Sequence, residues 1–253
     1  MERDDRPPVA TFFVDAAVSV GDPVSLDDNA SHHVRVKRLA VGDPVALTNG
    51  AGIVARGTLA DVRRRSIEVA IERTQRIPAA APIHLRVPIA DRDRMLWLAE
   101  KATELGIASW QSVRFRRSRS VSPRGEGPAF AEKVRARMIA ALEQSGGAWL
   151  PTILSDAELE TVAVGGGAPR VVLVGSGAPL LEIVGVAERR EPVLLFGPEG
   201  GIEAEELAWL GSAGWEPATL GSTTLRFETA GIAAVSIVRA AQLLAKSERA
   251  DHG

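Results

Sequence analysis

The sequence predicts an α/β protein in two parts, a small N-terminal β-barrel and a larger domain in which strands alternate with helices. Residues 10–75 contain short apolar runs with turn signals between them and no long helical pattern, as expected of a barrel. From Ile83 onward, apolar strands alternate with amphipathic helices, which is typical of an α/β domain. Between the two parts, residues 75–82 have the proline- and alanine-rich composition of a linker. We therefore expect one domain at residues 1–76 and a second at 77–253.

The expected barrel strands are short and lie between turns. Thr11–Val14 and Val45–Leu47 are apolar runs, and Asn49-Gly50 after the second is a strong turn signal. Ile53–Leu59 and Ser66–Ile71 continue the pattern, the latter with apolar residues at every second position. The three consecutive arginines that separate these last two runs are expected at a solvated hairpin tip.

The α/β part begins with an alternating apolar strand over Ile83–Ile89. Asp91 is placed to cap the helix that follows, and Gly106 is placed to end it. A second helix is expected from about Ala129 to Gln144, because apolar residues recur there at helical spacing and fit a core face. Residues 156–168 have the pattern of a short helix followed by a glycine-rich loop.

Two glycine-bearing loops, each between a short apolar strand and a helix, are the strongest sign of a binding site. Val193–Phe196 runs into Gly197–Gly201, and the glutamates of residues 203–206 suit the first turn of a helix. The second loop follows Leu220, and Thr229 is expected to cap the long apolar helix after it. Loops of this kind predict a small-molecule pocket at the carboxyl edge of a parallel sheet. The alternative is that both are ordinary strand-to-helix turns, since neither carries a phosphate-binding pattern.

The composition excludes several kinds of chemistry. The chain has no cysteine, which removes disulfides, thiolate metal sites and a cysteine nucleophile, and which fits a reducing compartment. No apolar run approaches a membrane span and the first six residues are hydrophilic, so we expect a cytoplasmic protein with no secretory signal. His32 and His33 are adjacent but lack further ligands at suitable spacing, so no metal site is expected.

Charge is distributed unevenly along a chain whose net charge is only −2. Residues 31–76 hold nine Lys/Arg against four Asp/Glu, a surplus of +5, whereas residues 191–253 hold four against nine, a surplus of −5. A basic N-terminal part indicates a polyanionic partner, and the alternative is a solvated surface with uneven charge. The residues predicted to contact the phosphate groups of such a partner, from this part and from a dense arginine run further on, are Arg35, Lys37, Arg38, Arg116, Arg117 and Arg119.

The two glycine-bearing loops together resemble the C-terminal signature of the bacterial 16S ribosomal RNA (uracil-N3)-methyltransferases, within the SPOUT superfamily. The matching residues are Gly197-Pro198-Glu199-Gly200-Gly201, Leu220-Gly221, Leu225-Arg226 and Glu228-Thr229-Ala230. Lys101–Gly106 and Glu143–Ser145 also match motifs of this family, and Ser31–Leu39 more loosely resembles its N-terminal barrel. The resemblance spans nearly the whole chain and is densest over residues 194–230.

The resemblance implies a SPOUT domain in which the chain is knotted, preceded by a PUA-like, RNA-binding barrel. It implies S-adenosylmethionine as cofactor, no metal, and a homodimer. The implied reaction is methylation of N3 of a specific uridine in 16S rRNA, with the assembled 30S ribosomal subunit as partner. The implied cofactor-binding residues are Leu195, Phe196, Gly197, Glu199, Gly200, Gly201, Leu220, Gly221, Leu225, Arg226, Thr229 and Ala230.

Two residues of the second loop are predicted to carry the chemistry. Uracil N3 bears a weakly acidic proton, so the reaction needs deprotonation or stabilisation of an anionic ring. Arg226 is a permanent cation suited to the second task, and Glu228 is the nearest candidate base. The alternative for this pair is a structural ion pair at a helix start.

The sequence departs from the family pattern at two places. Gly146–Trp149 stands where an Arg is usual after Glu143–Ser145, so that its RNA contact is either lost or supplied from residues 114–119. Phe227 stands where Thr is common. Two other functions are also compatible with the sequence: another SPOUT RNA methyltransferase, acting on a ribose 2′-oxygen or a guanine nitrogen, and a non-catalytic RNA-binding protein.

Overall fold

The computed structural model describes residues 6–63, 67–120, 123–162, 169–185 and 191–250. The chain forms two compact units. The first contains the residues up to Ala79 together with Ile139–Leu150, and the second contains Ala80–Met138 together with the residues from Pro151 onward. The predicted domain division at 76/77 did not anticipate that a later segment would join the first unit.

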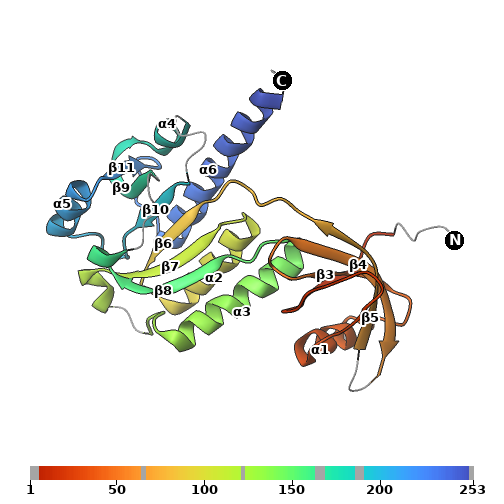
Figure 1. Cartoon of the computed structure of the whole chain (residues 1–253). Helices are drawn as coiled ribbons and strands as arrows, with labels where there is room; N and C mark the ends of the chain where they lie inside the picture. The colour runs from red at the N-terminus through yellow and green to blue at the C-terminus, as the bar shows by residue number, and fades with distance from the viewer. Residues whose placement is uncertain (1–5, 64–66, 121–122, 163–168, 186–190, 251–253) are drawn as a thin grey trace. The chain divides into compact units, whose positions relative to one another are not determined.

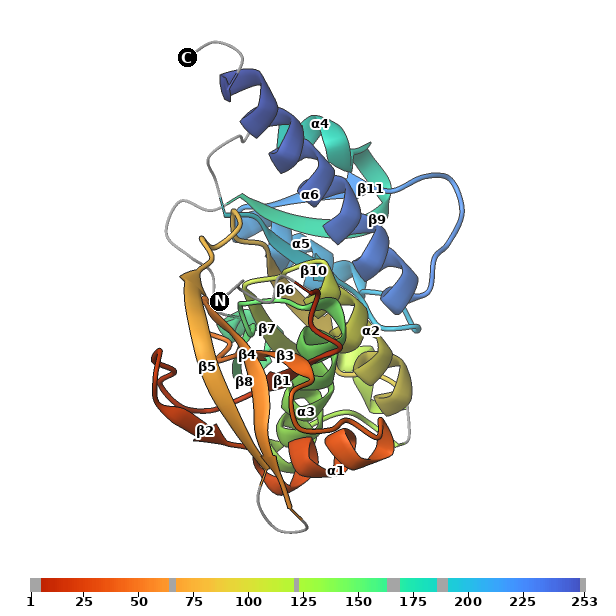
Figure 2. The same cartoon turned by 90° about the vertical axis from the view of Figure 1, so that its right-hand side faces the viewer.

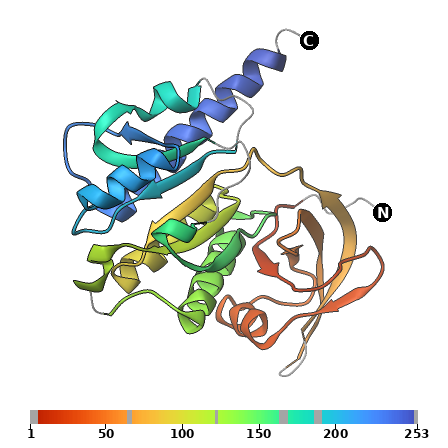
Figure 3. The same cartoon turned by 60° about the vertical axis from the view of Figure 1, so that its left-hand side comes forward.

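The first unit is built on a five-stranded sheet with the strand order β1-β3-β4-β5-β2. Figure 3 shows these strands in red and orange. The β1–β3 pair is parallel, and the other three pairs are antiparallel. Its core consists of apolar side chains that include Phe12, Leu47 and Ile67, each at most 1% exposed. The elements are β1 (Ala10–Phe13), β2 (Pro23–Ser25), α1 (Asp28–Val36), β3 (Pro44–Thr48), β4 (Ile53–Val62) and β5 (Ile67–Arg76).

Helix α1 was not predicted, and it accounts for the loosely matching basic segment. Asp27 begins the helix as an N-cap, since its Oδ1 accepts a hydrogen bond from the Ala30 backbone N–H at 2.8 Å. Val34 is fully buried in the core of the first unit, so the apolar side of the helix faces inward. The helix ends at Val36, and two residues later Arg38 has a φ of 55°, in the left-handed region where non-glycine residues are uncommon. The sequence therefore contained a capping residue for this helix, Asp27, but the helical segment after it is short.

The segment Ile139–Leu150 has a structural role in the first unit. The Oε1 atom of Glu143 accepts a hydrogen bond from the backbone N–H of Phe13 at 2.8 Å, and burial raises the pKa of this carboxyl. Trp149 donates from Nε1 to the Ile77 carbonyl at 2.9 Å. Its ring covers Gly52 so closely that a Cβ there would lie 2.4 Å from the ring. Of the residues that stand in place of the missing family Arg, Ala148 is buried, and Trp149 packs on Gly52 while remaining 36% exposed.

The second unit contains a six-stranded sheet with the order β11-β9-β10-β6-β7-β8 (Figure 1). All five of its strand pairs are parallel, so the carboxyl ends of the strands share one edge. The strands are β6 (His84–Pro88), β7 (Ser109–Arg114), β8 (Thr152–Glu158), β9 (Arg170–Pro179), β10 (Val193–Phe196) and β11 (Trp215–Thr219). The helices are α2 (Arg92–Glu104), η1 (Arg116–Ser120), α3 (Pro128–Ser145), η2 (Leu159–Thr161), α4 (Leu180–Gly185), α5 (Ala204–Ser212) and α6 (Phe227–Ala250).

Successive residues of strand β10 contribute to different parts of the core. Val193 and Leu195 belong to a cluster with Leu210 of α5 and Trp215 of β11. Phe196 lies near α6, since a Cβ on Gly231 of that helix would lie 3.1 Å from the phenyl Cζ. Helix α6 also packs against α2 and α4 (Figure 2). This arrangement is the expected one for a central strand of a parallel sheet, which is covered on both faces.

Helix α6 has a composition that the predicted absence of a membrane span did not anticipate. Among the described residues, α6 is long and apolar enough over Phe227–Ser247 to cross a membrane. In the most apolar stretch of this helix, 28% of the residues are buried. Length and composition alone support this statement, and the core helix of a globular protein meets the same criterion.

Several local predictions are confirmed and two are wrong. Asp91 caps α2, accepting from the backbone N–H groups of residues 93 and 94, and Gly106 follows the helix with a φ of 72°. The short helix predicted at the start of 156–168 is wrong: residues 156–158 are the end of β8, where Ala157 and Glu158 pair with β7, and Leu159–Thr161 form a 3₁₀ turn. Residues 163–168, where the glycine-rich loop was predicted, lie outside the described residues. Thr229 is not a cap, because α6 begins two residues earlier, at Phe227.

Candidate functional site

A cavity of about 450 Å³ lies at the carboxyl ends of β10 and β11, beside the middle of β9, in the second unit. Its main lining segments are residues 173–176 of β9, the loop after β10, and the loop between β11 and α6, and residues of α5 and α6 complete the wall. A volume of this size suits a small-molecule ligand. The sequence predicted a pocket at this edge, and the structure brings the two predicted loops together there.

Most of the residues predicted to bind a cofactor line this cavity. They are Phe196, Gly197, Glu199, Gly201, Leu220, Gly221, Leu225 and Ala230. Four others do not line it, namely Leu195, Gly200, Arg226 and Thr229. Leu195 was expected to form an apolar wall, but it is fully buried in the core cluster that includes α5. Leu220 and Leu225, from the second loop, provide the apolar wall instead.

The first loop depends on glycine for two different reasons. A Cβ on Gly197 would lie 2.5 Å from Cγ1 of Ile202, so only a residue without a side chain fits there. Gly201 donates from its backbone N–H to the Pro198 carbonyl at 2.8 Å, which closes a tight turn. Its φ of 77° lies in the left-handed region. The loop therefore presents backbone groups and the Glu199 side chain to the cavity.

Residues in the middle of β9 contribute to the cavity and were not assigned to it. They are Leu173, Val174, Gly175 and Ser176. The available signal was the glycine-containing stretch Gly175–Gly177, which follows the apolar run Val171–Val174. The residues that carry the family resemblance do not include this stretch. Further along, Gly177 allows β9 to approach β11, because a Cβ there would lie 2.4 Å from the Pro217 carbonyl oxygen.

Arg226 and Glu228 lie in different environments, and the structure forms no ion pair between them. Arg226 is exposed, and among the described residues its side chain has no ion-pair partner. Its carbonyl accepts a hydrogen bond from the Ala230 N–H at 2.9 Å, in the first turn of α6. Glu228 is 9% exposed, and its Oε1 lies 3.9 Å from Nε of Arg94. Its Oε2 is buried without a hydrogen-bond partner among the described residues.

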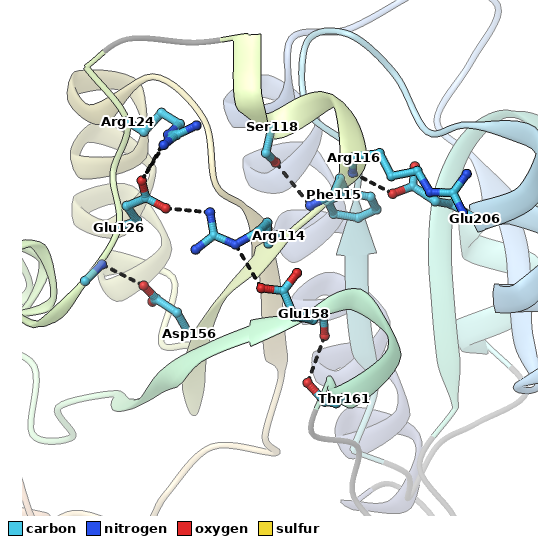
Figure 4. Close-up of polar contacts among 11 residues, drawn as sticks. Arg114, Phe115, Arg116, Ser118, Arg124, Glu126, Asp156, Glu158, Thr161 and Glu206 are labelled. Carbon is cyan, nitrogen blue, oxygen red and sulfur yellow. Dashed lines mark hydrogen bonds and ion pairs between the residues drawn. The ribbon is translucent and has the colours of Figure 1, made fainter.

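The arginine run after β7 is engaged with carboxylates within the second unit (Figure 4). Arg114 bridges Glu126 at 2.6 Å and Glu158 at 2.9 Å. The paired charges raise the pKa of Arg114 and lower the pKa of Glu126. The backbone N–H of Arg116 donates to Oε1 of Glu206 at 2.8 Å. This part of the run therefore has a structural role beside any contact with RNA.

Two of the predicted RNA-binding arginines hold the start of α5 and the glycine loop before it. Nη1 of Arg116 lies 3.3 Å from Oε2 of Glu203. Arg117 donates from Nη1 to the Gly200 carbonyl at 2.6 Å, and its Nε lies 3.5 Å from Glu203. Glu203 and Glu206 form a capping box at the helix N-terminus, as the acidic first turn predicted. The side chain of Arg119 lies outside the described residues.

The predicted RNA-binding residues of the first unit lie at the exposed end of α1. Arg35, Lys37 and Arg38 are all exposed and follow one another around the helix terminus. The neighbouring His33 is partly buried with its ring 5.7 Å from that of Phe12, and burial lowers its pKa. Of the predicted hairpin tip only Arg63 is described, and it pairs with Asp61 at 2.8 Å. No group of three or more potential metal ligands occurs among the described residues.

Comparisons with known proteins agree with this architecture. A family described as the RNA methyltransferase domain matches residues 78–239, and a family described as the RNA methyltransferase PUA domain matches residues 26–72. Ribosomal RNA small subunit methyltransferase E of Mycobacterium bovis is 28% identical over 242 residues, which cover 90% of each chain. The protein of the same name from Mycobacterium tuberculosis gives the same values.

Solved structures show the same fold. A ribosomal RNA small subunit methyltransferase E from Neisseria gonorrhoeae, bound to S-adenosyl methionine, has a TM-score of 0.79 and 26% identity, covering 93% of this chain and 97% of its own. A putative methyltransferase from Legionella pneumophila, in complex with the cofactor SAM, has a TM-score of 0.78 at 24% identity, covering 91% of this chain and 97% of its own. The predicted combination of an α/β methyltransferase domain with a PUA-like domain is confirmed. The chain belongs to the RNA methyltransferase family, with the methyltransferase domain in its C-terminal part and the PUA domain in its N-terminal part.

Proposed function

We propose that this protein uses S-adenosylmethionine to methylate N3 of a specific uridine in 16S rRNA, with the assembled small ribosomal subunit as acceptor. The observation that carries the proposal is the cavity at the carboxyl edge of the parallel sheet, formed by the two loops of the family signature. The Neisseria gonorrhoeae relative, which is solved with this cofactor, supports the assignment. The identity of the base and atom rests on the sequence resemblance.

The residues of the cavity fit S-adenosylmethionine. The glycines at 201 and 221 leave room for a ligand close to the backbone, and Leu220 and Leu225 provide apolar surface for an adenine ring. Glu199 also lines the cavity, with its Oε1 3.2 Å from Nη1 of Arg94. When bound, the cofactor supplies an electrophilic methyl group. The chain's own task is to align the acceptor and to manage the charge of the uracil ring.

We assign this second task to Arg226. Arg226 follows directly on Leu225, which lines the cavity, so the Arg226 backbone belongs to the cofactor loop. Its guanidinium is exposed and is available to the acceptor. A permanent cation stabilises a uracil anion, or binds the phosphate beside the target base. Glu228 as base stays a prediction, because its carboxylate is mostly buried beside Arg94.

The proposed reaction is tested by nucleoside mass spectrometry of 16S rRNA. Purified protein, S-adenosylmethionine and either 30S subunits or free 16S rRNA from a strain lacking the gene are incubated, and the modified nucleosides are identified. We expect 3-methyluridine, formed much faster on 30S subunits. Formation of a 2′-O-methylated nucleoside or a methylguanosine instead assigns the other SPOUT chemistries. Cofactor binding without any methylated product contradicts an enzymatic role on this RNA.

We also propose that the PUA-like unit binds RNA phosphate through the end of α1. Changing Arg35, Lys37 and Arg38 together to Gln should weaken RNA binding. Each lost phosphate contact should make the slope of log affinity against log salt shallower by about 0.7 to 0.9. Filter binding at several salt concentrations measures both quantities. The control is Lys133→Gln combined with Lys246→Gln, since both lysines are exposed and both belong to the second unit. An unchanged salt slope in the triple variant would show that these cations do not contact RNA.

We further propose a cytoplasmic homodimer, as the resemblance implies. Helix α6 leaves Leu243 and Leu244 60% and 63% exposed, which is unusual surface for a lone chain and suits a second copy. Sedimentation velocity should give a dimer for the wild type, and changing both leucines to Gln should shift it toward monomer. A wild-type chain that sediments as a monomer at micromolar concentration contradicts the proposal.

A further inference from the structure

Arg94, which the sequence analysis did not single out, lies where both loops of the cavity meet a third element. It belongs to the first turn of α2, next to the capping residue Asp91. Its Nη1 lies 3.2 Å from Oε1 of Glu199, within the first loop. Its Nε lies 3.9 Å from Oε1 of Glu228, at the end of the second loop. One guanidinium therefore joins two carboxylates that are 29 positions apart in the sequence.

The environment of Glu228 makes this cation important. The residue is only 9% exposed, and its Oε2 has no hydrogen-bond partner among the described residues. A buried carboxylate is costly unless a cation or donors compensate it. Arg94 is the cation within 4 Å of this carboxylate in the described part of the chain. The cost of burying Glu228 is thus tied to the position of Arg94.

Helix α2 is a rigid base for this contact. It packs along α6, and a Cβ on Gly231 would lie 2.9 Å from Cδ1 of Leu98, so the two helices approach closely. Leu98 is one turn after Arg94 on α2 and is fully buried. The Arg94 side chain, by contrast, is 36% exposed, and a partly exposed ion pair adds little to global stability. Its contribution is therefore expected in the geometry of the loops rather than in the fold.

We propose that Arg94 is a positioning residue of the methyltransferase site, which cross-links the Glu199 loop to the start of α6 and so fixes the two walls of the cofactor cavity. The inference rests on the proposed function, because it assigns a role at the same site. A planar guanidinium holds its donors in fixed directions and can contact two separate carboxylates at once, whereas an ammonium group is a compact charge on a flexible stem. Arginine is therefore expected to fix the two loops better than lysine.

The first test measures loop order and cofactor binding without any RNA. In Arg94→Ala, hydrogen exchange should become faster in both residues 197–203 and residues 220–228 of the cofactor-free protein. S-adenosylmethionine affinity, measured by calorimetry, should fall about tenfold, which corresponds to about 1.4 kcal/mol. Arg94→Lys should recover part of the affinity. Arg92→Ala is the matched control, because Arg92 lies on the same helix and its Nε is 3.6 Å from the exposed Asp93.

The second test is a double-mutant cycle on cofactor affinity. If Arg94 acts through its two carboxylates, the losses from Arg94→Ala and Glu199→Gln should not add, and the same should hold for Arg94→Ala with Glu228→Gln. Arg94→Ala with wild-type exchange and affinity, or with the same small change as Arg92→Ala, would overturn the proposal. Because these readouts need no acceptor, a wild-type protein that binds the cofactor but methylates no RNA contradicts the proposed function alone.

Discussion

Arg226→Ala is expected to slow methyl transfer about a hundredfold while S-adenosylmethionine affinity stays close to the wild-type value. A charge-assisted contact made mainly in the transition state contributes on the order of 3 kcal/mol, which corresponds to this factor. The structure supports the division of roles. The side chain is exposed and has no ion-pair partner among the described residues, so its removal breaks no ion pair in that part of the chain. The backbone carbonyl that begins α6 is kept in the variant.

Single-turnover rates with 30S subunits, together with calorimetry of cofactor binding, separate the two quantities. Arg226→Lys is the informative second variant, since it keeps the charge but loses the planar fork that can hold two oxygens. A slow transfer rate in Arg226→Ala that recovers in Arg226→Lys indicates charge stabilisation. A slow rate in both variants indicates bidentate recognition. A wild-type rate for Arg226→Ala means that the residue has no part in transfer.

The same assay distinguishes two roles for Glu228. If it is the base, the rate loss of Glu228→Gln should become smaller at high pH, where N3 of uracil ionises unaided. If it serves mainly to hold the loop through Arg94, the loss should be the same at every pH and should appear in cofactor affinity. The burial of its Oε2 and the 3.9 Å approach of Arg94 favour the second outcome.

The features that the sequence predicted well are those set by residues close together in the chain. The apolar run Val193–Phe196 is strand β10, and the acidic residues after it form the first turn of α5 with a capping box. The helix predicted from about Ala129 to Gln144 is α3, Pro128–Ser145. In each case the period of the apolar residues and the chemistry of the ends agree, so local preference and tertiary structure give the same element.

The features that the sequence missed depend on partners far along the chain. Residues 156–158 became the end of β8 because β7 offered a strand to pair with, and the ion pair between Arg114 and Glu158 lies across these two strands. The contact of Arg117 with the Gly200 carbonyl, 83 residues away, was likewise not predicted, and the predicted contact of Arg117 with RNA stays a prediction. No local pattern marks such a partner. The same reasoning explains why Arg94 and the middle of β9 were not assigned to the site.

The loop after β10 gives the other large expected effect, because Gly201→Val should abolish measurable cofactor binding. Gly201 has a φ of 77°, and a β-branched residue in this region is strained by roughly 1–3 kcal/mol. Relief of that strain would open the turn that Gly201 closes on Pro198 at 2.8 Å, and the new side chain would stand at the cavity wall. We expect at least a hundredfold loss of S-adenosylmethionine affinity, or roughly 3 kcal/mol.

Gly214→Val separates this effect from simple destabilisation. Gly214 has nearly the same φ, 79°, lies in the same unit between α5 and β11, and is not among the residues that line the cavity. Both variants should lose a similar amount of thermal stability from backbone strain, and circular dichroism will show whether they fold. Calorimetry should then find wild-type affinity in Gly214→Val and none in Gly201→Val. A folded Gly201→Val that binds the cofactor normally would show that this loop does not form the binding site.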